Sequence, residues 1–565
     1  MSNNSDRNSE PSNLNSTKDS PNLNNSNETS ENSSKVKIPE LENIKTKKEN
    51  LNNPEKTEKI MPKIEIPQRK GDYEDSDQLI DLSNEIEMIT DELKETYYDD
   101  LLNKQDMSLL QIKALIESSL LYFIEGLHVS LTGMIFIPIV KYYRLSQLRG
   151  CLISSSLMIF MAIGNLISGF LTNKFVRKKI IIYSLLTISV GSILSTYPSW
   201  IILLFCRCII GLSLGIVMPI NTNNLSEVLP LKLRSFWLIF VSSFFSVGAI
   251  LSCQLIKYNV NRLSILFSTI SIPSSTVLII FNYFYNENPR YLILIGKRDK
   301  AFHIIEKYLL LDHHKLNSYE KTQITKSIDR GVNKEVKITG KFKFIFRRYG
   351  NITLNLCIIW ILYSMIINGG IFSLFVSFAN NAIFIPSEEV EFNILRIKGF
   401  FLIIQLFYTF FAVSTVIAGL FTEIKYCGRK NTIFFGFLIS TITSFHVLIF
   451  REKSRILYFL VTCLINISFN AINSYTIEVY PTRVRDFALG YLLFVSKIIG
   501  FFSNILALLM NFTNKKWMLY INSILGVLGL IFTLMLPFDT YQRKLDDIMT
   551  KKPKERKNEI PIIGN

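Results

Sequence analysis

Long apolar segments recur through most of this chain and constrain its fold more than any other feature. A bilayer crossing needs roughly 20 apolar residues in a helix. Backbone polar groups in hydrocarbon must be satisfied within their own segment, so each such stretch is predicted to be a helix. From Lys113 onward the chain holds twelve of them, at residues 113–140, 150–172, 179–196, 200–224, 235–256, 263–285, 352–378, 399–421, 432–450, 455–476, 487–511 and 517–537.

The distribution of charge separates a tail from this apolar body. Residues 1–112 hold 14 Lys and Arg against 24 Asp and Glu, whereas the remaining residues hold 48 against 22. Residues 1–70 are rich in Asn, Ser, Lys and Glu and nearly free of aromatic residues, so they bury too little surface to offset chain entropy. We predict a disordered acidic tail over 1–112, with a short amphipathic helix within 77–110. The charges of the body lie between apolar runs rather than along one face, which argues against a nucleic-acid partner.

The basic residues between the segments predict the orientation in the membrane. If the N-terminus is cytosolic, the cytosolic loops and C-terminal tail hold nearly three times as many Lys and Arg as the opposite loops. The positive-inside rule then places both termini in the cytosol. The predicted organisation is an acidic tail (1–112), a six-helix half (113–285), a basic loop with short helices (286–351), a second six-helix half (352–537) and a basic tail (538–565).

Two short motifs repeat at one common distance. Gly169 in GFLTNKFVRK is followed 250 residues later by Gly419 in GLFTEIKYCGRK. The Glu, Pro and Arg of EVLPLKLR (227–234) recur with the same spacing 251 residues later in EVYPTRVR (478–485). Two unrelated motifs displaced by the same distance indicate a duplicated six-helix unit, an arrangement typical of transporters with a central binding site.

The same residues resemble the major facilitator superfamily of transporters over nearly all of residues 113–547. Residues 169–178 are similar to the loop between helices 2 and 3 of that superfamily, and Arg207 to Gly215 to its fourth helix. ENPRYL (287–292) resembles the signature that follows helix 6 in sugar porters. YTIEVYPTRVR (475–485) with Gly490, and LP (536–537) with Asp539 and Thr540, resemble organic-ion and synaptic-vesicle-type transporters. The resemblance implies a secondary active transporter that is a monomer and not an enzyme.

The motifs also depart from the family pattern at acidic positions. Asn173 stands where the family usually has Asp, and Glu423 lies two residues early with Lys425 in the usual acidic place. In the family these acids help to close the cytosolic gate. We predict that the gate uses ion pairs at cytosolic helix ends, which break when the halves rock. Its candidate residues are Gly169, Asn173, Arg177, Glu227, Arg234, Glu423, Arg429, Glu478 and Arg485.

Few ionisable groups lie inside the predicted membrane segments, and each is a functional candidate because burial in hydrocarbon is costly. Glu125 and His128 in FIEGLH resemble the D-G-x-D motif of proton-coupled aromatic-acid symporters, which implies a role in proton coupling. The alternative is that Glu125 only anchors helix contacts while His128 faces water. His128 stands at the position of the second acid of that motif.

Arg207 and Lys497 are the buried cations. One comes from each half, so together they could hold an anionic solute across a central cavity. Alternatively, Arg207 pairs with Glu125. Polar and aromatic residues on two further segments are candidates to line the same cavity, and they are Asn470, Asn473, Trp360 and Tyr363.

The sequence shows no metal-ligand spacing among its seven Cys and no phosphate-binding loop, so no cofactor is implied. We therefore predict a proton-coupled transporter of a small organic anion or zwitterion, of which a vitamin such as pantothenate is one example. A sugar transporter, and a transport-inactive membrane sensor or receptor, are the alternatives. The plasma membrane is the expected location, and an organelle membrane is the second.

Overall fold

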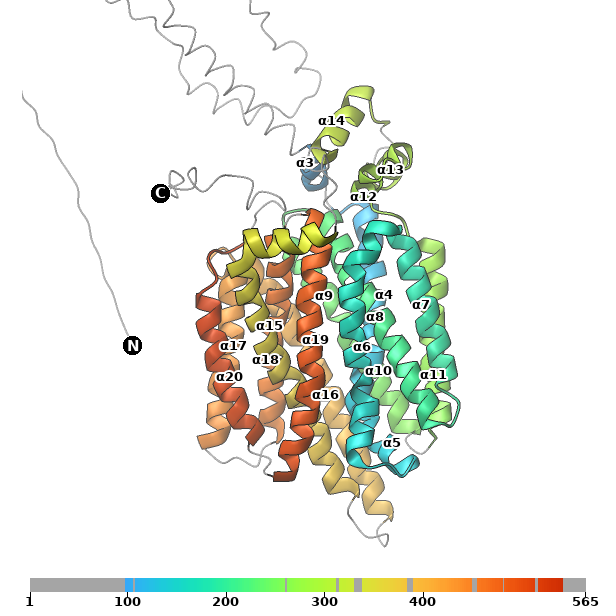
Figure 1. Cartoon of the computed structure of the whole chain (residues 1–565), viewed down its shortest axis with the longest axis vertical. Helices are drawn as coiled ribbons and strands as arrows, with labels where there is room; N and C mark the ends of the chain where they lie inside the picture. Colours follow the sequence, from blue (N-terminus) through green and yellow to red (C-terminus); the bar gives the residue numbers. More distant parts are fainter. Residues whose placement is uncertain are drawn as a thin grey trace, which may run out of the picture. The chain divides into compact units, whose positions relative to one another are not determined.

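The computed structural model is helical throughout the residues it describes, which all lie in the unit Leu82–Asn565 (Figure 1). These are residues 97–104, 107–259, 262–310, 315–329, 338–383, 390–449, 455–480, 482–513 and 517–541. The predicted tail up to residue 96 and the basic C-terminal tail beyond 541 lie outside them. Within the predicted amphipathic segment 77–110, the structure shows the short helix α3 (Tyr97–Lys104).

A first group of helices follows α3, and together these helices cover the first six predicted segments. They are α4 (Leu109–Met134), α5 (Phe136–Tyr142), α6 (Gln147–Lys174), α7 (Arg177–Leu194), α8 (Trp200–Val228), α9 (Arg234–Ser242), α10 (Phe244–Asn259) and α11 (Leu263–Phe284). The helix of the first predicted segment, α4, begins at Leu109 and not at 113, because Ser108 and Gln111 form a reciprocal capping box.

A second group covers the other six predicted segments. It consists of α15 (Ile338–Ile383), α16 (Val390–Glu423), α17 (Gly428–Ile449), α18 (Arg455–Val479), α19 (Thr482–Thr513) and α20 (Trp517–Leu534). Between the groups lie α12 (Pro289–Leu294), α13 (Arg298–Ile304), the π-helix η3 (Ile305–Leu309) and α14 (Ser318–Asp329). Among the described residues, eight spans are long and apolar enough to cross a membrane. The count of twelve crossings stays a prediction.

The two groups pack in matching ways. In the first, α6 packs on α8, α4 on α10, and α7 on both α8 and α11. The equivalent pairs in the second are α16 on α18, α15 on α19, and α17 on both α18 and α20. The groups meet where α6 packs on α19 and α10 on α16. This matched packing is what a duplicated unit requires.

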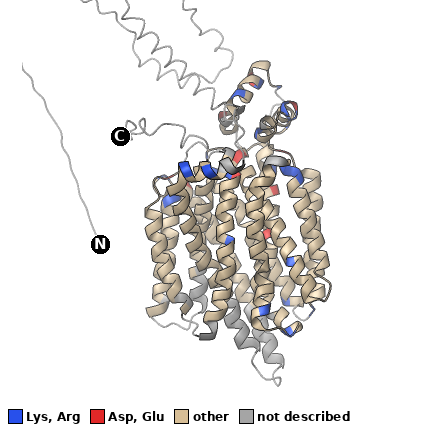
Figure 2. Ribbon diagram, in the orientation of Figure 1, with Lys and Arg blue, Asp and Glu red and all other residues tan. Residues whose placement is uncertain are grey.

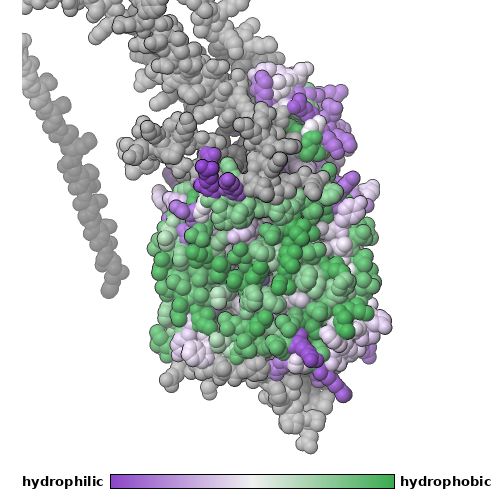
Figure 3. Space-filling view, in the orientation of Figure 1, coloured by the Kyte–Doolittle hydropathy of each residue, from purple (hydrophilic) through white to green (hydrophobic). Residues whose placement is uncertain are grey.

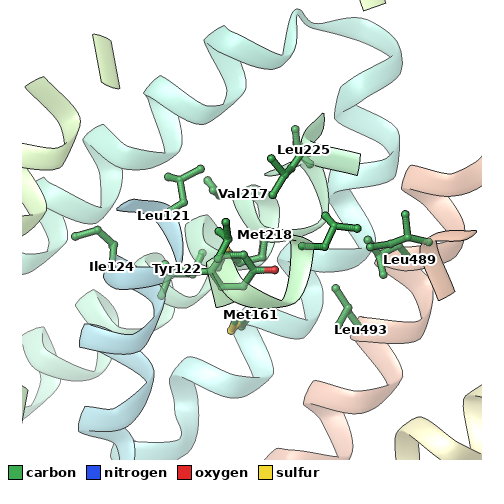
Figure 4. Close-up of a cluster of buried hydrophobic side chains, with 14 of the residues drawn as sticks. Leu121, Tyr122, Ile124, Met161, Val217, Met218, Leu225, Leu489 and Leu493 are labelled. Atoms are coloured by element: carbon green, nitrogen blue, oxygen red, sulfur yellow. The ribbon is translucent and has the colours of Figure 1, made fainter. Parts of the chain in front are cut away.

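The surface and the core of the bundle fit a membrane environment. Apolar side chains cover the middle of the face seen in Figure 3. Lys and Arg gather at the end of the bundle that carries α12 to α14, which we call the charged end (Figure 2). Inside, apolar side chains of α4, α6 and α8 meet those of α19, so the two groups share a core (Figure 4).

Candidate functional site

A central cavity of about 130 Å³ lies between the two groups of helices. Its lining comes from α4, α6, α9 and α10 on one side and from α15, α16, α18 and α19 on the other. Among the described residues that line it, Glu125 and Lys497 are the charged ones. The cavity is thus built by both halves of the repeat, and its charges are few.

Glu125 and Lys497 meet across this cavity. Nζ of Lys497 on α19 lies 3.7 Å from Oε1 of Glu125 on α4, and both side chains are largely buried. An ion pair removed from water needs its partner, because either charge left alone is strongly destabilised. The pair therefore joins the two halves and places one cation and one carboxylate where a solute would bind.

Aromatic rings form one wall of the cavity. Tyr363 on α15 stacks on Phe469 of α18 with ring centroids 4.8 Å apart and an interplanar angle of 19°. Trp360 meets Phe469 edge-on at 5.6 Å, and its indole Nε1 donates to Oγ1 of Thr476 at 3.3 Å. Trp360 and Tyr363 both line the cavity, as the sequence predicts. Flat rings held in this way offer a planar, apolar surface to a bound solute.

Amide and hydroxyl groups complete the lining. Oδ1 of Asn470 accepts a hydrogen bond from Ser242 of the first half at 2.7 Å, and its Nδ2 donates to the Asn466 carbonyl. Nδ2 of Asn466 is satisfied by α16, whereas its Oδ1 has no partner among the described residues. The hydroxyl of Thr132, which also lines the cavity, has none either. These two groups are free to bond a ligand.

Three predicted site residues do not line the cavity. His128 turns away from it, because its Nε2 lies 3.0 Å from Oγ of Ser274 on α11 and 3.5 Å from Oγ of Ser192 on α7. Arg207 does not pair with Glu125 or reach the cavity; its Nη1 donates to the backbone carbonyl of His128 at 3.2 Å. Asn473 lies beside the hydroxyl of Tyr122, outside the lining. The expectation of two cations gripping one anion is therefore wrong for Arg207.

A network of ion pairs joins helices at the charged end in the first half. Arg177 at the start of α7 contacts Glu227 at the end of α8, with Nη1 2.9 Å from Oε2. It also reaches the second half, where its Nη2 lies 3.3 Å from Oδ2 of Asp486 on α19. Asp486 in turn accepts from the amide of Asn223 on α8. One arginine thus ties α7 and α8 to the helix across the interface.

The second half repeats this network with its own residues. Arg429 contacts Glu478 at 3.2 Å and Glu423 at 3.4 Å. Oε1 of Glu478 accepts from Oγ of Ser235 on α9 at 3.0 Å, and Oε1 of Glu423 accepts from the backbone N–H of Phe236 at 3.2 Å. Glu423 therefore joins the two halves although its place in the motif is shifted.

The remaining predicted gate residues lie at helix ends and at helix contacts. Nε of Arg485 donates to the Tyr480 carbonyl at 3.1 Å, and its Nη1 to Asn223 at 3.5 Å. Arg234 is buried at the start of α9. Gly169 lets α6 approach α19, since a Cβ there would lie 2.8 Å from Cα of Phe487. The side chain of Asn173 lies outside the described residues. Sequence reasoning missed Asp486, although it directly follows Arg485 of the repeated motif.

Apolar contacts join the halves at the opposite end. Phe136 on α5 meets Phe372 on α15 with ring centroids 5.5 Å apart, and both belong to a small buried cluster with Cys151, Ala507 and Leu508. Nearby, Nδ2 of Asn504 donates to Oγ of Ser155 at 3.1 Å. The halves therefore contact each other on both sides of the cavity, by charges at one end and by apolar groups at the other.

Comparisons with known proteins agree with this architecture. A family model described as "Sugar (and other) transporter" matches residues 86–551. Organic cation/carnitine transporter 7 of Arabidopsis thaliana is 30% identical over 200 residues, which span 35% of this chain and 40% of that protein. The niacin transporter NiaP of Acinetobacter baylyi is 23% identical over 392 residues, which span 67% of this chain and 82% of that protein.

A solved structure shows the same fold. The major facilitator proton:xylose symporter XylE bound to 6-bromo-6-deoxy-D-glucose superimposes with a TM-score of 0.62 at 16% identity, covering 77% of this chain and 97% of that one. The family match, together with this fold, defines a membrane transporter of small organic solutes, not an enzyme. The chain belongs to the sugar (and other) transporter family.

Proposed function

We propose that this protein is a secondary active transporter that moves a small organic anion or zwitterion together with protons by alternating access. The observation that carries the proposal is the Glu125–Lys497 pair, which lies in the cavity and joins the two halves. A cation in a buried cavity attracts an anionic group, and intramembrane charges typically mark a transport pathway.

The pair supplies a way to couple solute binding to a proton. At 3.7 Å, Lys497 is held by the Glu125 carboxylate when that group is charged. An anionic solute competes with Glu125 for the same ammonium group. Protonation of Glu125 removes the competitor, so proton binding and anion binding favour each other. His128 takes no part in this scheme, because its ring bonds Ser274 outside the cavity.

The rest of the lining favours a planar solute with a carboxylate. The stacked Tyr363 and Phe469 offer a flat surface beside Lys497, and Asn466 Oδ1 offers an acceptor for a polar substituent. Niacin, the solute named for the relative NiaP, is an aromatic carboxylate. Pantothenate, an aliphatic carboxylate, belongs to the same charge class. A sugar is the alternative, because the family model includes sugar transporters.

Uptake of labelled solutes by transporter-deficient cells tests the proposal. We expect saturable uptake of nicotinate or another small carboxylate that is faster at pH 5.5 than at pH 7.5 and is lost with a protonophore. Lys497→Gln should lower uptake about tenfold or more, because it removes a charge-assisted contact worth about 1.5–3 kcal/mol. Glu125→Gln should make the remaining uptake indifferent to pH.

The matched control is Lys257→Gln, which removes a cation of α10 that does not line the cavity. Its uptake should equal that of the unchanged protein at equal surface expression. Saturable uptake of a neutral sugar that is unaffected by Lys497→Gln would show the sugar alternative to be right. If no solute is taken up by any form, the sensor or receptor alternative gains instead.

We also propose that the protein acts as a monomer in the plasma membrane with both termini in the cytosol. The excess of Lys and Arg in the segments that lie at the charged end supports this orientation. The two halves of one chain enclose the cavity between them, so a single copy can form a complete transport pathway. Uptake by intact cells checks the plasma-membrane location. An N-terminal epitope that antibodies reach only after permeabilisation checks the orientation, and light scattering of the purified protein checks the monomer.

A further inference from the structure

Arg207 is a buried cation that has no counter-ion among the described residues. It lies on α8 and is 1% exposed. Of its three guanidinium nitrogens, Nη1 donates to the His128 carbonyl, whereas Nε and Nη2 have no partner within the described part of the chain. An arginine stays charged in proteins. The free-energy cost of burying its charge without a counter-ion therefore cannot be avoided by losing the proton.

Within the described part of the chain, no acidic side chain pairs with Arg207. The ring of His128 is engaged by Ser274 and Ser192. The hydroxyls of these serines donate to the carbonyls of Ile270 and Ile188 in their own helices. Glu125, on the same helix as His128, pairs with Lys497. The described contacts around the guanidinium are therefore neutral.

Two other buried arginines of the bundle, by contrast, contact acidic side chains. Arg177 meets Glu227 and Asp486, and Arg429 meets Glu478 and Glu423. An unpaired charge inside the bilayer costs several kcal/mol, and water could bond the free N–H groups but could not neutralise the charge. An anion from solution would accept these hydrogen bonds and also neutralise the charge.

We propose that a small inorganic anion of the halide class binds beside Arg207, between α4 and α8, and supplies its missing counter-charge. Nε and Nη2 of Arg207 donate to it. The site is separate from the central cavity, whose lining does not include Arg207. The bound anion stabilises the first half of the bundle, because a ligand that binds only the folded state raises its stability by mass action.

Thermal unfolding of the purified full-length protein in detergent tests this site. At constant ionic strength, replacing sodium gluconate by sodium chloride should raise Tm in a saturable manner. Arg207→Gln should abolish that rise. Lys497→Gln is the matched control: it removes a cation of the cavity and should keep the rise. Bromide should give an anomalous scattering peak beside residue 207 in crystals.

His128→Glu keeps the test decisive if Arg207→Gln does not fold. This change places a carboxylate near Arg207 and so replaces the bound anion by an internal one. The variant should be as stable in gluconate as the unchanged protein is in chloride, and it should no longer respond to chloride. Equal Tm in both salts for the unchanged protein, or a chloride response that persists in either Arg207→Gln or His128→Glu, would overturn the proposal.

Discussion

Glu287 shows how a single side chain outside the membrane segments responds to pH. It lies between α11 and α12, where Oε1 accepts from the backbone N–H of Lys178 at 3.3 Å and Oε2 has no partner among the described residues. Burial raises the pKa of this carboxyl, and the contacts with Lys178 and Arg177 offset only part of the rise. The charged form is therefore less favourable here than in water.

The raised pKa of Glu287 determines how its contribution to folding stability depends on pH. As pH rises, the unfolded chain loses the Glu287 proton first, so the folded state binds more protons between the two pKa values and becomes less stable there. Glu287→Gln removes the penalty and keeps an acceptor for Lys178. We expect its Tm to exceed that of the unchanged protein at pH 7 and the gap to shrink at pH 4.5, measured by fluorescence. A gap that widens on acidification would contradict the assignment.

At the same scale, the sequence located the charges inside the bundle better than it predicted their partners. Glu125 and Lys497 could be found because charges in apolar segments are few, and the structure brings them together. The partner of Arg207 could not be found, because it depends on which face of α8 meets α4. Asp486 was missed because a charge at a helix end carries no hydropathy signal.

At the scale of the helix, hydropathy finds where a helix crosses the membrane but not where it begins. α15 begins at Ile338, well before the predicted 352. Its first turns carry Lys and Arg, so hydropathy does not include them in the apolar stretch. The predicted segment 235–256 is divided between α9 and α10 at Ser243. There the hydroxyl of Ser243 donates to the carbonyl of Phe240, which competes with regular helix geometry.

Glycines set how closely α6 and α8 approach. A Cβ at Gly215 would overlap the carbonyl oxygen of Met161 and lie 2.9 Å from the backbone N of Asn165. Gly215→Ala should therefore lower the free energy of unfolding by about 1–3 kcal/mol, the usual cost of overpacking. Tm in detergent and the yield of monodisperse protein measure the effect.

Gly350 provides the matched control for this substitution. It lies within α15, and a Cβ there would meet nothing within 4 Å. Gly350→Ala should leave Tm unchanged or raise it, because Ala is favoured over Gly in a helix by about 1 kcal/mol. Equal losses of Tm in both variants would mean that helix backbone freedom, and not the contact between α6 and α8, sets the effect.

At the scale of the whole molecule, the two halves hold each other by reciprocal contacts. Ser235 and Asp486 stand at the same place in the repeat, one residue after Arg234 and Arg485. Ser235 bonds Glu478 of the second half, and Asp486 bonds Arg177 of the first. The duplication was visible in the sequence, but this crossing of partners was not, because it depends on how the two halves face each other.

The proposed alternating access requires these contacts to break when the charged end opens. Asp486→Asn weakens both the ion pair with Arg177 and the bond from Asn223. A lost charge-assisted hydrogen bond is worth about 1.5–3 kcal/mol, enough to shift a two-state population by roughly tenfold or more. We therefore expect the variant to populate a state in which the charged end is open.

Spin labels on the two halves can measure that shift. Lys232→Cys and Lys425→Cys place labels at exposed positions of the charged end, one in each half. In a background without reactive native cysteines, Asp486→Asn should add a longer distance to the distribution from pulsed electron resonance. Glu306→Gln breaks the partly exposed pair with Lys321 instead, and should leave the distribution as it is. If Asp486→Asn also left it unchanged, the Arg177–Asp486 contact would not hold the gate, and closure would rest on Glu478 and Glu423.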